Sequence, residues 1–215
     1  MALDFYHGHG SPYSWRVWLA LEHKKIPYQL KLLSFQNEDT KKPEFVAINP
    51  RHTVPTIVDD GYALWESMAI VEYLDERFTS GTKLYPGDAK NRARIRRLIR
   101  EMENNLDVKG IDPITDEFFW SGDKGPDMDK VAKGREVCKA ELEYFAKELR
   151  GKFIDGDTPC AADYVLMPML GYVSRIDFRK PEAKLTEVVP APLAEYKKRI
   201  EALPYYDKTF PAHWR

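Results

Sequence analysis

The sequence predicts an α/β domain with a mixed four-stranded sheet, followed by an all-α helical domain. Over residues 1–79, short apolar runs alternate with helical periodicity in the order β-α-β-α-β-β-α. A polar link with glycine and proline, TSGTKLYPGD, follows at residues 79–88. Beyond it, long charged segments have helical periodicity and none resembles a strand hairpin. We therefore expect an α/β domain over 1–79, a linker over 80–88 and a helical domain over 89–215.

The first three elements form a strand, a helix and a second strand. Leu3–Tyr6 is a short apolar run that ends in a glycine- and histidine-containing loop. From Ser14 onward, apolar residues recur with helical spacing until Pro27 stops the helix. Tyr28–Leu33 then alternates as a strand does. Two strands joined through a helix are expected to be parallel.

The remaining elements of this domain close the sheet. Lys42–Ile48 is a short helical segment, and Thr56–Val58 and Tyr62–Leu64 are two β runs across an Asp-Asp-Gly turn. Glu66–Phe78 has helical periodicity again. The closing hairpin is antiparallel, so the predicted sheet is mixed.

The second domain is predicted from helical periodicity alone. The segment 107–127 carries glycine, proline and the aromatic cluster Phe118 to Trp120, and it is assigned to neither of its neighbouring helices. The helix from Ala161 is the least polar and is expected to form the core of this domain. The expected helices are Lys90–Asn105, Met128–Arg150, Ala161–Ile176, Pro192–Ala202 and Tyr205–Phe210.

Composition excludes several classes of function. The 215 residues carry 33 Lys and Arg against 34 Asp and Glu, a formal net charge of −1, which argues against a general nucleic-acid binder. No apolar run approaches the ~20 residues of a membrane span. The start, MALDFYHGHG, lacks the basic and apolar regions of a secretory signal. We expect a cytoplasmic protein with no nucleic-acid or membrane partner.

Metal and disulfide chemistry are not expected either. The chain has two cysteines, too few for a disulfide framework or a cysteine-rich zinc site. His7 and His9 lie in a glycine-rich loop without a third ligand, which makes a poor metal site. We therefore expect no metal.

The first candidate for chemistry is the sequence Ser-Pro-Tyr-Ser at 11–14, between the first strand and the first helix. A helix N-terminus presents free N–H groups that stabilise an anion. A serine there is commonly only an N-cap; we expect Ser14 in that role, which leaves Ser11 on the preceding loop. Cysteines at both positions would form a dithiol redox motif. Serines cannot form a disulfide, but a hydroxyl can donate a hydrogen bond to the thiolate of another molecule.

Two further motifs have the composition of an amino-acid binding site. Val54-Pro55 precedes an expected strand. We predict that the bond between them is cis, because a cis bond would expose the Val54 backbone to an extended peptide. The alternative is an ordinary trans proline at the start of a strand. Glu66 and Ser67 open a helix. They are either capping groups or ligands of an α-ammonium and an α-carboxylate.

Together these motifs resemble the glutathione transferase family, most closely its serine-type theta and zeta classes. The resemblance covers almost the whole chain and rests on SPYSWRVWLAL (11–21), NPRHTVPTI (49–57), ESMAIVEYL (66–74) and GDTPCAAD (156–163). It implies a thioredoxin-like first domain that binds glutathione, an all-helical second domain and a homodimer. It also implies glutathione as co-substrate and no prosthetic group.

The resemblance assigns roles to individual residues. Ser11 would contact the glutathione sulfur. Val54, before a cis Pro55, would pair with the cysteinyl backbone. Glu66 and Ser67 would hold the γ-glutamyl end.

Three positions depart from the family pattern. Tyr13 stands where zeta-type enzymes have a cysteine. Thr53 stands where Lys or Gln often meets the glycyl carboxylate, so Arg51 or His52 is the candidate for that contact.

The third departure lies at the start of the core helix. Cys160 occupies the position of the Ser or Thr that caps this helix in the family, three residues before Asp163. Cysteine is a poor cap, so we expect Thr158, with Pro159 at the first helical position, to serve instead.

The resemblance places the electrophile in a pocket of the helical domain. The candidates for this pocket, otherwise expected to be core residues, are Phe118, Trp120, Tyr172 and Arg175. The basic run that begins at Arg92 has no evident partners within the chain, which favours a solvated or dimer-facing helix over a phosphate site. We expect a homodimer in which the N-terminal domain of one copy meets the helical domain of the other.

These observations predict a glutathione transferase in which Ser11 stabilises the thiolate for attack on an electrophilic small molecule. Lowering a thiol pKa of about 8.5 by two units corresponds to ~2.7 kcal/mol, and one charge-assisted hydrogen bond supplies ~1.5–3 kcal/mol. Ser11 and the helix N-terminus are therefore sufficient. The alternatives are a glutathione-dependent isomerase, dehalogenase or ether-cleaving lyase on the same fold, or a non-catalytic glutathione-binding or scaffold module.

Overall fold

The computed structural model describes residues 3–214, which divide into two compact units. The first comprises the described residues up to Pro86 together with those from Leu203 onward, and the second is Gly87–Ala202. The sequence analysis counted the residues after 202 with the helical domain, whereas in the structure they group with the first unit.

The first unit is built on a four-stranded sheet in the order β2-β1-β3-β4. β1 (Leu3–Gly8) runs parallel to β2 (Tyr28–Leu33) and antiparallel to β3 (Thr56–Asp59), and β3 pairs antiparallel with β4 (Tyr62–Trp65). The predicted mixed sheet is confirmed. A helical crossover makes β1 and β2 parallel, and a tight Asp-Gly turn with positive φ at both residues closes the β3–β4 hairpin.

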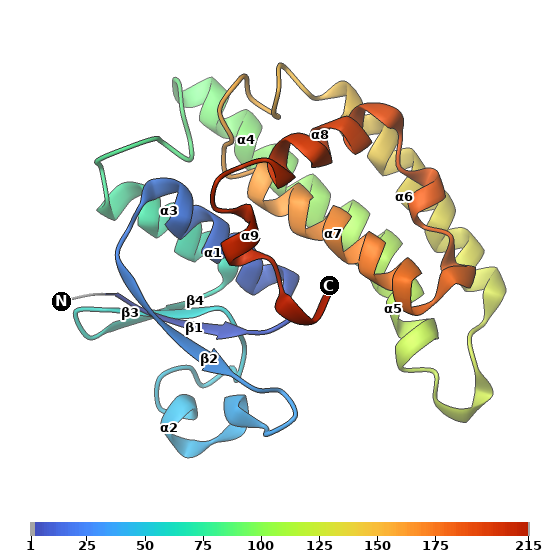
Figure 1. Cartoon of the computed structure of the whole chain (residues 1–215), viewed down its shortest axis with the longest axis horizontal. Helices are drawn as coiled ribbons and strands as arrows, with labels where there is room; N and C mark the ends of the chain where they lie inside the picture. The colour runs from blue at the N-terminus through green and yellow to red at the C-terminus, as the bar shows by residue number, and fades with distance from the viewer. Residues whose placement is uncertain (1–2, 215) are drawn as a thin grey trace. The chain divides into compact units, whose positions relative to one another are not determined.

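Three helices pack on this sheet, namely α1 (Pro12–Lys24), α2 (Pro43–Val46) and α3 (Ser67–Arg77). Figure 1 shows α1 and α3 side by side on one face of the sheet and α2 on the opposite face. α1 begins at Pro12, two residues before the predicted start. The prediction placed the start too late because the first turn of the helix is not part of the apolar pattern. A fourth, short helix, α9 (Tyr206–Thr209), comes from the end of the chain.

A buried ion pair fixes the end of α1. Lys24 Nζ lies 3.0 Å from Asp75 Oδ1 on α3 and also donates to the Thr82 carbonyl at 3.2 Å. The same carboxylate accepts from the N–H groups of Leu84 and Tyr85 at 2.8 and 3.2 Å. Although burial opposes the charge, the N–H of Leu84 and the ammonium of Lys24 hold the pKa of Asp75 below its usual value. The segment that leads out of the sheet domain is thereby attached to α1 and α3.

The second unit consists of helices and connecting loops. Among the described residues, no helix combines the length and the apolar character needed to cross a bilayer. The helices are α4 (Ala89–Glu101), a π-helix (Met102–Ile111), α5 (Asp112–Phe119), α6 (Met128–Lys147), α7 (Asp163–Arg179) and α8 (Ala191–Glu201).

The helix predicted to end near Asn105 continues without a break to Phe119. Gly110 is not a helix stop in this structure but a contact point. A Cβ on Gly110 would lie 2.8 Å from Sγ of Cys138 on α6, so glycine allows the two helices to lie close together here. Pro113 lies in the first turn of α5, directly after the π-helix.

The cap predicted for α7 is wrong. α7 begins at Asp163, so Thr158 and Pro159 lie outside it. The fully buried Asp163 carboxylate instead accepts from the N–H groups of Cys160 at 2.7 Å and Ile154 at 3.0 Å. A carboxylate in the first helical turn therefore accepts hydrogen bonds from the backbone N–H groups of the loop before the helix.

The arginines of α4 have partners inside the second unit. Arg94 pairs with Glu148 at 2.7 Å and with Asp155 at 3.3 Å. Arg97 pairs with Glu101 at 2.9 Å and with Glu148 at 3.1 Å. The basic run thus belongs to an ion-pair network within the unit, and it no longer provides a reason to expect a dimer face.

We predict that Lys24→Met lowers the free energy of unfolding by about 3–5 kcal/mol, because Asp75 is left buried without its cation. The exposed pair of Lys198 and Glu195, 2.8 Å apart, provides a control. Lys198→Met should leave the free energy of unfolding nearly unchanged, because water screens an exposed pair. Urea titration followed by circular dichroism measures both. Similar losses in the two variants would contradict the importance of the buried pair.

Candidate functional site

Ser11 lies at the tip of the β1–α1 loop and caps α1. Its N–H donates to the Gly8 carbonyl at 3.2 Å, and its Oγ accepts from the N–H of Ser14 at 3.2 Å. The prediction that Ser14 is the N-cap is therefore wrong. Ser14 is buried inside the helix, and its Oγ accepts a long hydrogen bond, 3.5 Å, from the N–H of Gly8. Because the Ser11 oxygen acts as acceptor, its hydroxyl hydrogen is available for an outward bond.

The end of β1 packs tightly against the segment that contains the cis proline. The Val54–Pro55 bond is cis, as predicted. A Cβ on Gly8 would lie 2.7 Å from Cγ2 of Val54 and 2.6 Å from Cζ of Phe35. Glycine at this position therefore allows the Val54 segment to lie close to the base of the Ser11 loop.

Asn49 builds the turn that precedes Val54. Its Nδ2 donates to the Thr53 carbonyl and to Thr56 Oγ1, both at 2.9 Å, and its Oδ1 accepts from the N–H of Arg51 at 2.9 Å. The sequence analysis did not single out Asn49. The Asn-Pro pair at 49–50 is the signal that identifies it, because asparagine before proline commonly starts a turn.

The two candidates for the carboxylate contact, Arg51 and His52, and the neighbouring Thr53 are exposed on this turn. His52 Nδ1 lies 3.3 Å from the Thr40 carbonyl oxygen, and Thr53 Oγ1 accepts from Asn49 Nδ2 at 3.2 Å. These two side chains help to hold the turn. Arg51 supplies its permanent positive charge, because guanidinium is protonated at any ordinary pH.

Glu66 has an unusual backbone conformation at the start of α3. Its φ is +71° and its ψ is 111°, and within the described chain its carboxylate makes no capping hydrogen bond. Backbone strain of this kind is concentrated at functional sites. Ser67, the next residue, is buried, and its Oγ accepts from Nη1 of Arg16 at 3.4 Å.

Arg16, which the sequence analysis did not single out, contacts two residues of the candidate site region. It is fully buried on α1, and its guanidinium lies over the ring of Tyr13, 4.4 Å from the centroid. The available signal was a cation in an otherwise apolar helical stretch. Through Ser67, this side chain links α1 to the start of α3.

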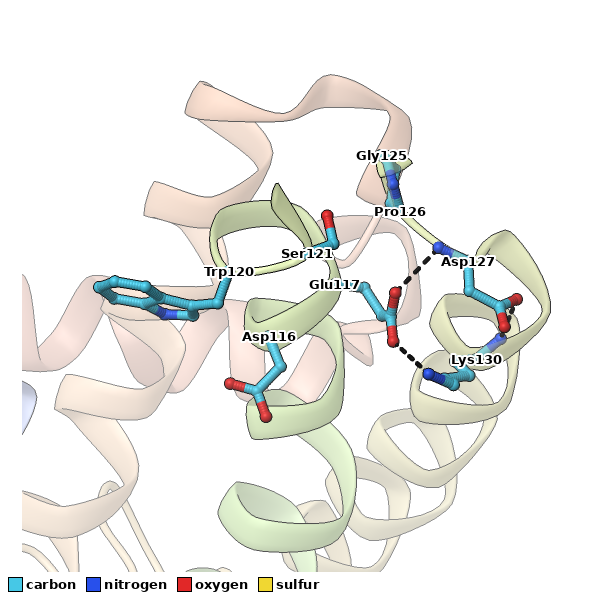
Figure 2. Close-up of a pocket in the computed structure, with 8 residues that line it drawn as sticks. All are labelled: Asp116, Glu117, Trp120, Ser121, Gly125, Pro126, Asp127 and Lys130. Carbon is cyan, nitrogen blue, oxygen red and sulfur yellow. Dashed lines mark hydrogen bonds and ion pairs between the residues drawn. The ribbon is translucent and has the colours of Figure 1, made fainter. Parts of the chain in front are cut away.

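The candidates for the electrophile pocket are distributed over the second unit. Trp120 is 78% exposed and Phe118 is buried, while Tyr172 and Arg175 are half-buried. Among the residues described, only Trp120 of these four lines an open hollow of about 620 Å³. Figure 2 shows the side chains around it. The hollow is lined by Asp116, Glu117, Trp120, Ser121, Gly125, Pro126, Asp127 and Lys130.

The polar wall of this hollow is held by Glu117. Its carboxylate pairs with Lys130 Nζ at 2.7 Å and accepts from the N–H of Asp127 at 2.9 Å (Figure 2). Glu117 and Lys130 offset each other's charge, and the carboxylates of Asp116 and Asp127 leave the lining of the hollow with an excess of negative charge.

His7 is a fully buried imidazole at the end of β1. Among the described residues, neither of its ring nitrogens has a hydrogen-bond partner. Burial, followed by the charges of His9 and His213, lowers the pKa of His7 to about 3, so the ring is neutral at pH 7. No group of three His, Cys, Asp or Glu side chains in the described chain is arranged to hold a metal ion.

The chain is similar to known proteins over most of its length. A family profile described as the N-terminal domain of glutathione S-transferase matches residues 10–77. Glutathione S-transferase D7 of Drosophila melanogaster is 32% identical over 179 residues, 82% of this chain and 77% of that protein. The crystal structure of a glutathione S-transferase from the Antarctic clam Laternula elliptica, 26% identical, has a TM-score of 0.83 and covers 100% of this chain and 94% of that one. Poplar glutathione transferase F1, 22% identical, shares the fold with a TM-score of 0.81 over 97% and 96% of the two chains.

We predict that Glu66→Gly raises the free energy of unfolding by about 1 kcal/mol, because glycine adopts positive φ with little strain. Glu76, exposed in the last turns of the same helix, provides the control. Glu76→Gly should lower the free energy of unfolding, by up to about 1 kcal/mol. Urea titration measures both. A loss of stability in both variants would show that the Glu66 backbone is not strained.

We predict that His7 makes the protein less stable as pH falls. Below about pH 6.5 the unfolded chain binds a proton that the folded chain does not bind until about pH 3. The stability that this group contributes above pH 6.5 is therefore lost on acidification, at up to about 1.4 kcal/mol per pH unit. Urea titrations of wild type and His7→Leu between pH 6.5 and 4.5 measure the two slopes. The slope should be shallower in His7→Leu, and equal slopes would contradict the prediction.

Proposed function

The chain belongs to the glutathione S-transferase family, and we propose that its Ser11 stabilises the thiolate of bound glutathione for attack on an electrophile. The observation that carries this proposal is the hydrogen bonding of Ser11. Its Oγ accepts from the helix, so the hydroxyl hydrogen is the part of the group left to donate to a sulfur. The N-terminus of α1 adds a favourable potential for the anion.

Glutathione is proposed to bind along the loops at one end of the sheet. The Val54 backbone pairs with the cysteinyl residue, next to the loop of Ser11. The carboxylate of Glu66 takes the γ-glutamyl ammonium, and Ser67, positioned by its hydrogen bond from Arg16, takes the α-carboxylate. Strain at Glu66 supports this role, because a binding contact explains why it is tolerated.

The glycyl carboxylate is proposed to meet the turn before Val54. Arg51 provides the permanent charge there, while His52 and Thr53 are engaged in holding the turn. We therefore favour Arg51 over His52 for this contact.

The proposed reaction transfers the glutathionyl group. The thiolate sulfur supplies the electron pair of a new bond to the electrophilic atom, and the leaving group departs with the electrons of the bond that breaks. Trp120, Tyr172 and Arg175 are the electrophile-pocket candidates that a substrate can reach, because Phe118 is buried.

Ser11→Ala should raise the pKa of the bound thiol by about one to two units, a loss of ~1.4–2.7 kcal/mol. Turnover near neutral pH should then fall about ten- to a hundredfold, while glutathione affinity changes little. The same variant loses the helix cap, at about 1 kcal/mol of stability. Ultraviolet titration of the bound thiolate measures the pKa directly.

Ser14→Ala is the matched control, because it removes a hydroxyl that faces Gly8 inside the fold. It should cost about 1 kcal/mol of stability and leave the thiol pKa unchanged. A shifted titration in Ser14→Ala with an unchanged one in Ser11→Ala would exchange the two roles. A wild-type protein that neither binds immobilised glutathione nor forms the thiolate would be a scaffold module.

We also propose a cytoplasmic homodimer, on the strength of the family membership. Light scattering at micromolar concentration should then give about twice the 25.0 kDa mass of the chain. A mass equal to that of one chain would contradict the dimer without affecting the role of Ser11.

A further inference from the structure

The described end of the chain is packed against α1 around one fully buried side chain, Trp15. The indole N–H of Trp15 donates to Thr209 Oγ1 at 3.1 Å. Its ring lies 5.8, 5.5 and 5.7 Å from those of Tyr206, Phe210 and Trp214. Figure 1 shows this segment crossing α1 within the first unit. The last described residues therefore have a defined place on the helix that carries the site.

This packing places His213 beside the loop of Ser11. Nε2 of His213 lies 2.5 Å from the position that a Cβ on Gly10 would occupy, and Cε1 lies 2.8 Å from it. Gly10 has φ +83°, a backbone conformation that favours glycine, and the nearby imidazole leaves no space for a side chain at this position. Ser11 is the next residue, with its Cα about 3.8 Å further along the chain. The imidazole thus lies against the residue that directly precedes the serine proposed to hold the sulfur.

His213 is the outer member of a row of three imidazoles, formed with His7 and His9. The ring centroids are 5.5 Å apart between His7 and His9 and 5.8 Å apart between His9 and His213. Exposure rises along the row, from buried His7 through half-buried His9 to exposed His213.

A proton that enters this row is confined to its outer part. The titratable groups that face His7 are His9 and His213, and with burial they keep His7 neutral. Of the charged groups on the terminal segment, Lys208 is paired with Glu22 at 2.6 Å, and Asp207 also has a partner. The exposed imidazole is therefore the member of the row from which a proton is released to water.

We propose that His213 accepts the thiol proton of bound glutathione, an inference that rests on the proposed role of Ser11. The S–H bond breaks and an N–H bond forms on the imidazole, directly or through one water. The electron pair stays on sulfur, where the Ser11 hydroxyl donates a hydrogen bond to it. The imidazolium then releases the proton to solvent. Histidine suits this task because its ordinary pKa lies close to neutral pH.

The test compares His213→Gln with His23→Gln. His23 also contacts the terminal segment, with Nδ1 3.0 Å from the hydroxyl of Tyr205, but it lies at the opposite end of α1. Each protein is mixed rapidly with glutathione near pH 6.5 in weak buffer. Thiolate absorbance and a pH indicator follow the two products. His213→Gln should slow both signals about tenfold or more, with a glutathione Kd within about twofold of wild type, whereas His23→Gln should match wild type.

Two further measurements separate a base from a structural contact. Added imidazole should restore the rate of His213→Ala and leave wild type unchanged, because a small base then takes the missing ring's place. Gly10→Ala should reproduce the slow rate by displacing His213. Gly61→Ala is the control for strain, since Gly61 has φ +85° and, among the described atoms, no neighbour within 4 Å of the added Cβ.

Wild-type rates in His213→Gln, or a His213→Ala variant that does not respond to imidazole, would overturn the role of His213 and leave that of Ser11 intact. A wild-type protein that forms no thiolate would overturn both proposals. The two failures are thus distinguished by the thiolate signal of the wild type alone.

Discussion

Helix α1 is enclosed by the rest of the first unit, and the polar side chains that it buries need partners there. A buried charge that loses its partner costs several kcal/mol. Lys24 pairs with Asp75, Arg16 donates to Ser67, and the indole of Trp15 donates to the terminal segment. Segments distant in sequence are thereby attached to one helix.

This attachment supports the proposal that the short loop of Ser11 positions the glutathione sulfur. A hydrogen-bond donor stabilises a developing charge most effectively when no reorganisation is needed at the moment of reaction. α1 is fixed along its length, so the position of its N-cap, Ser11, is fixed as well. The strained backbone of Glu66 is retained next to Ser67, which the same helix holds through Arg16. The stability of the surrounding unit therefore supports a locally unfavourable conformation.

Local patterns predicted the sheet and most helices, but they failed where a local signal was overlooked and where a residue's role is set by a distant contact. The cap was assigned to Ser14 because the apolar periodicity begins at Trp15, whereas Pro12 at the first helical position marks Ser11 as the cap. Residues 107–119 were assigned to no helix, although the helix continues through them and Gly110 lies against Cys138 of α6. The placement of His213 over the site loop was inaccessible for the same reason, since no local pattern records it.

A serine hydroxyl meets only half of the requirement for a thiolate. It donates a hydrogen bond to the anion and so lowers the thiol pKa, but it is too weak a base to take up the proton itself. The group that lowers the thiol pKa therefore differs from the group that takes up the proton. In this chain the donor caps α1, and the proposed acceptor, His213, lies on a segment that packs against Trp15 of the same helix. Because both are attached to one buried helix, the donor and the acceptor keep their positions relative to each other when the sulfur loses its proton.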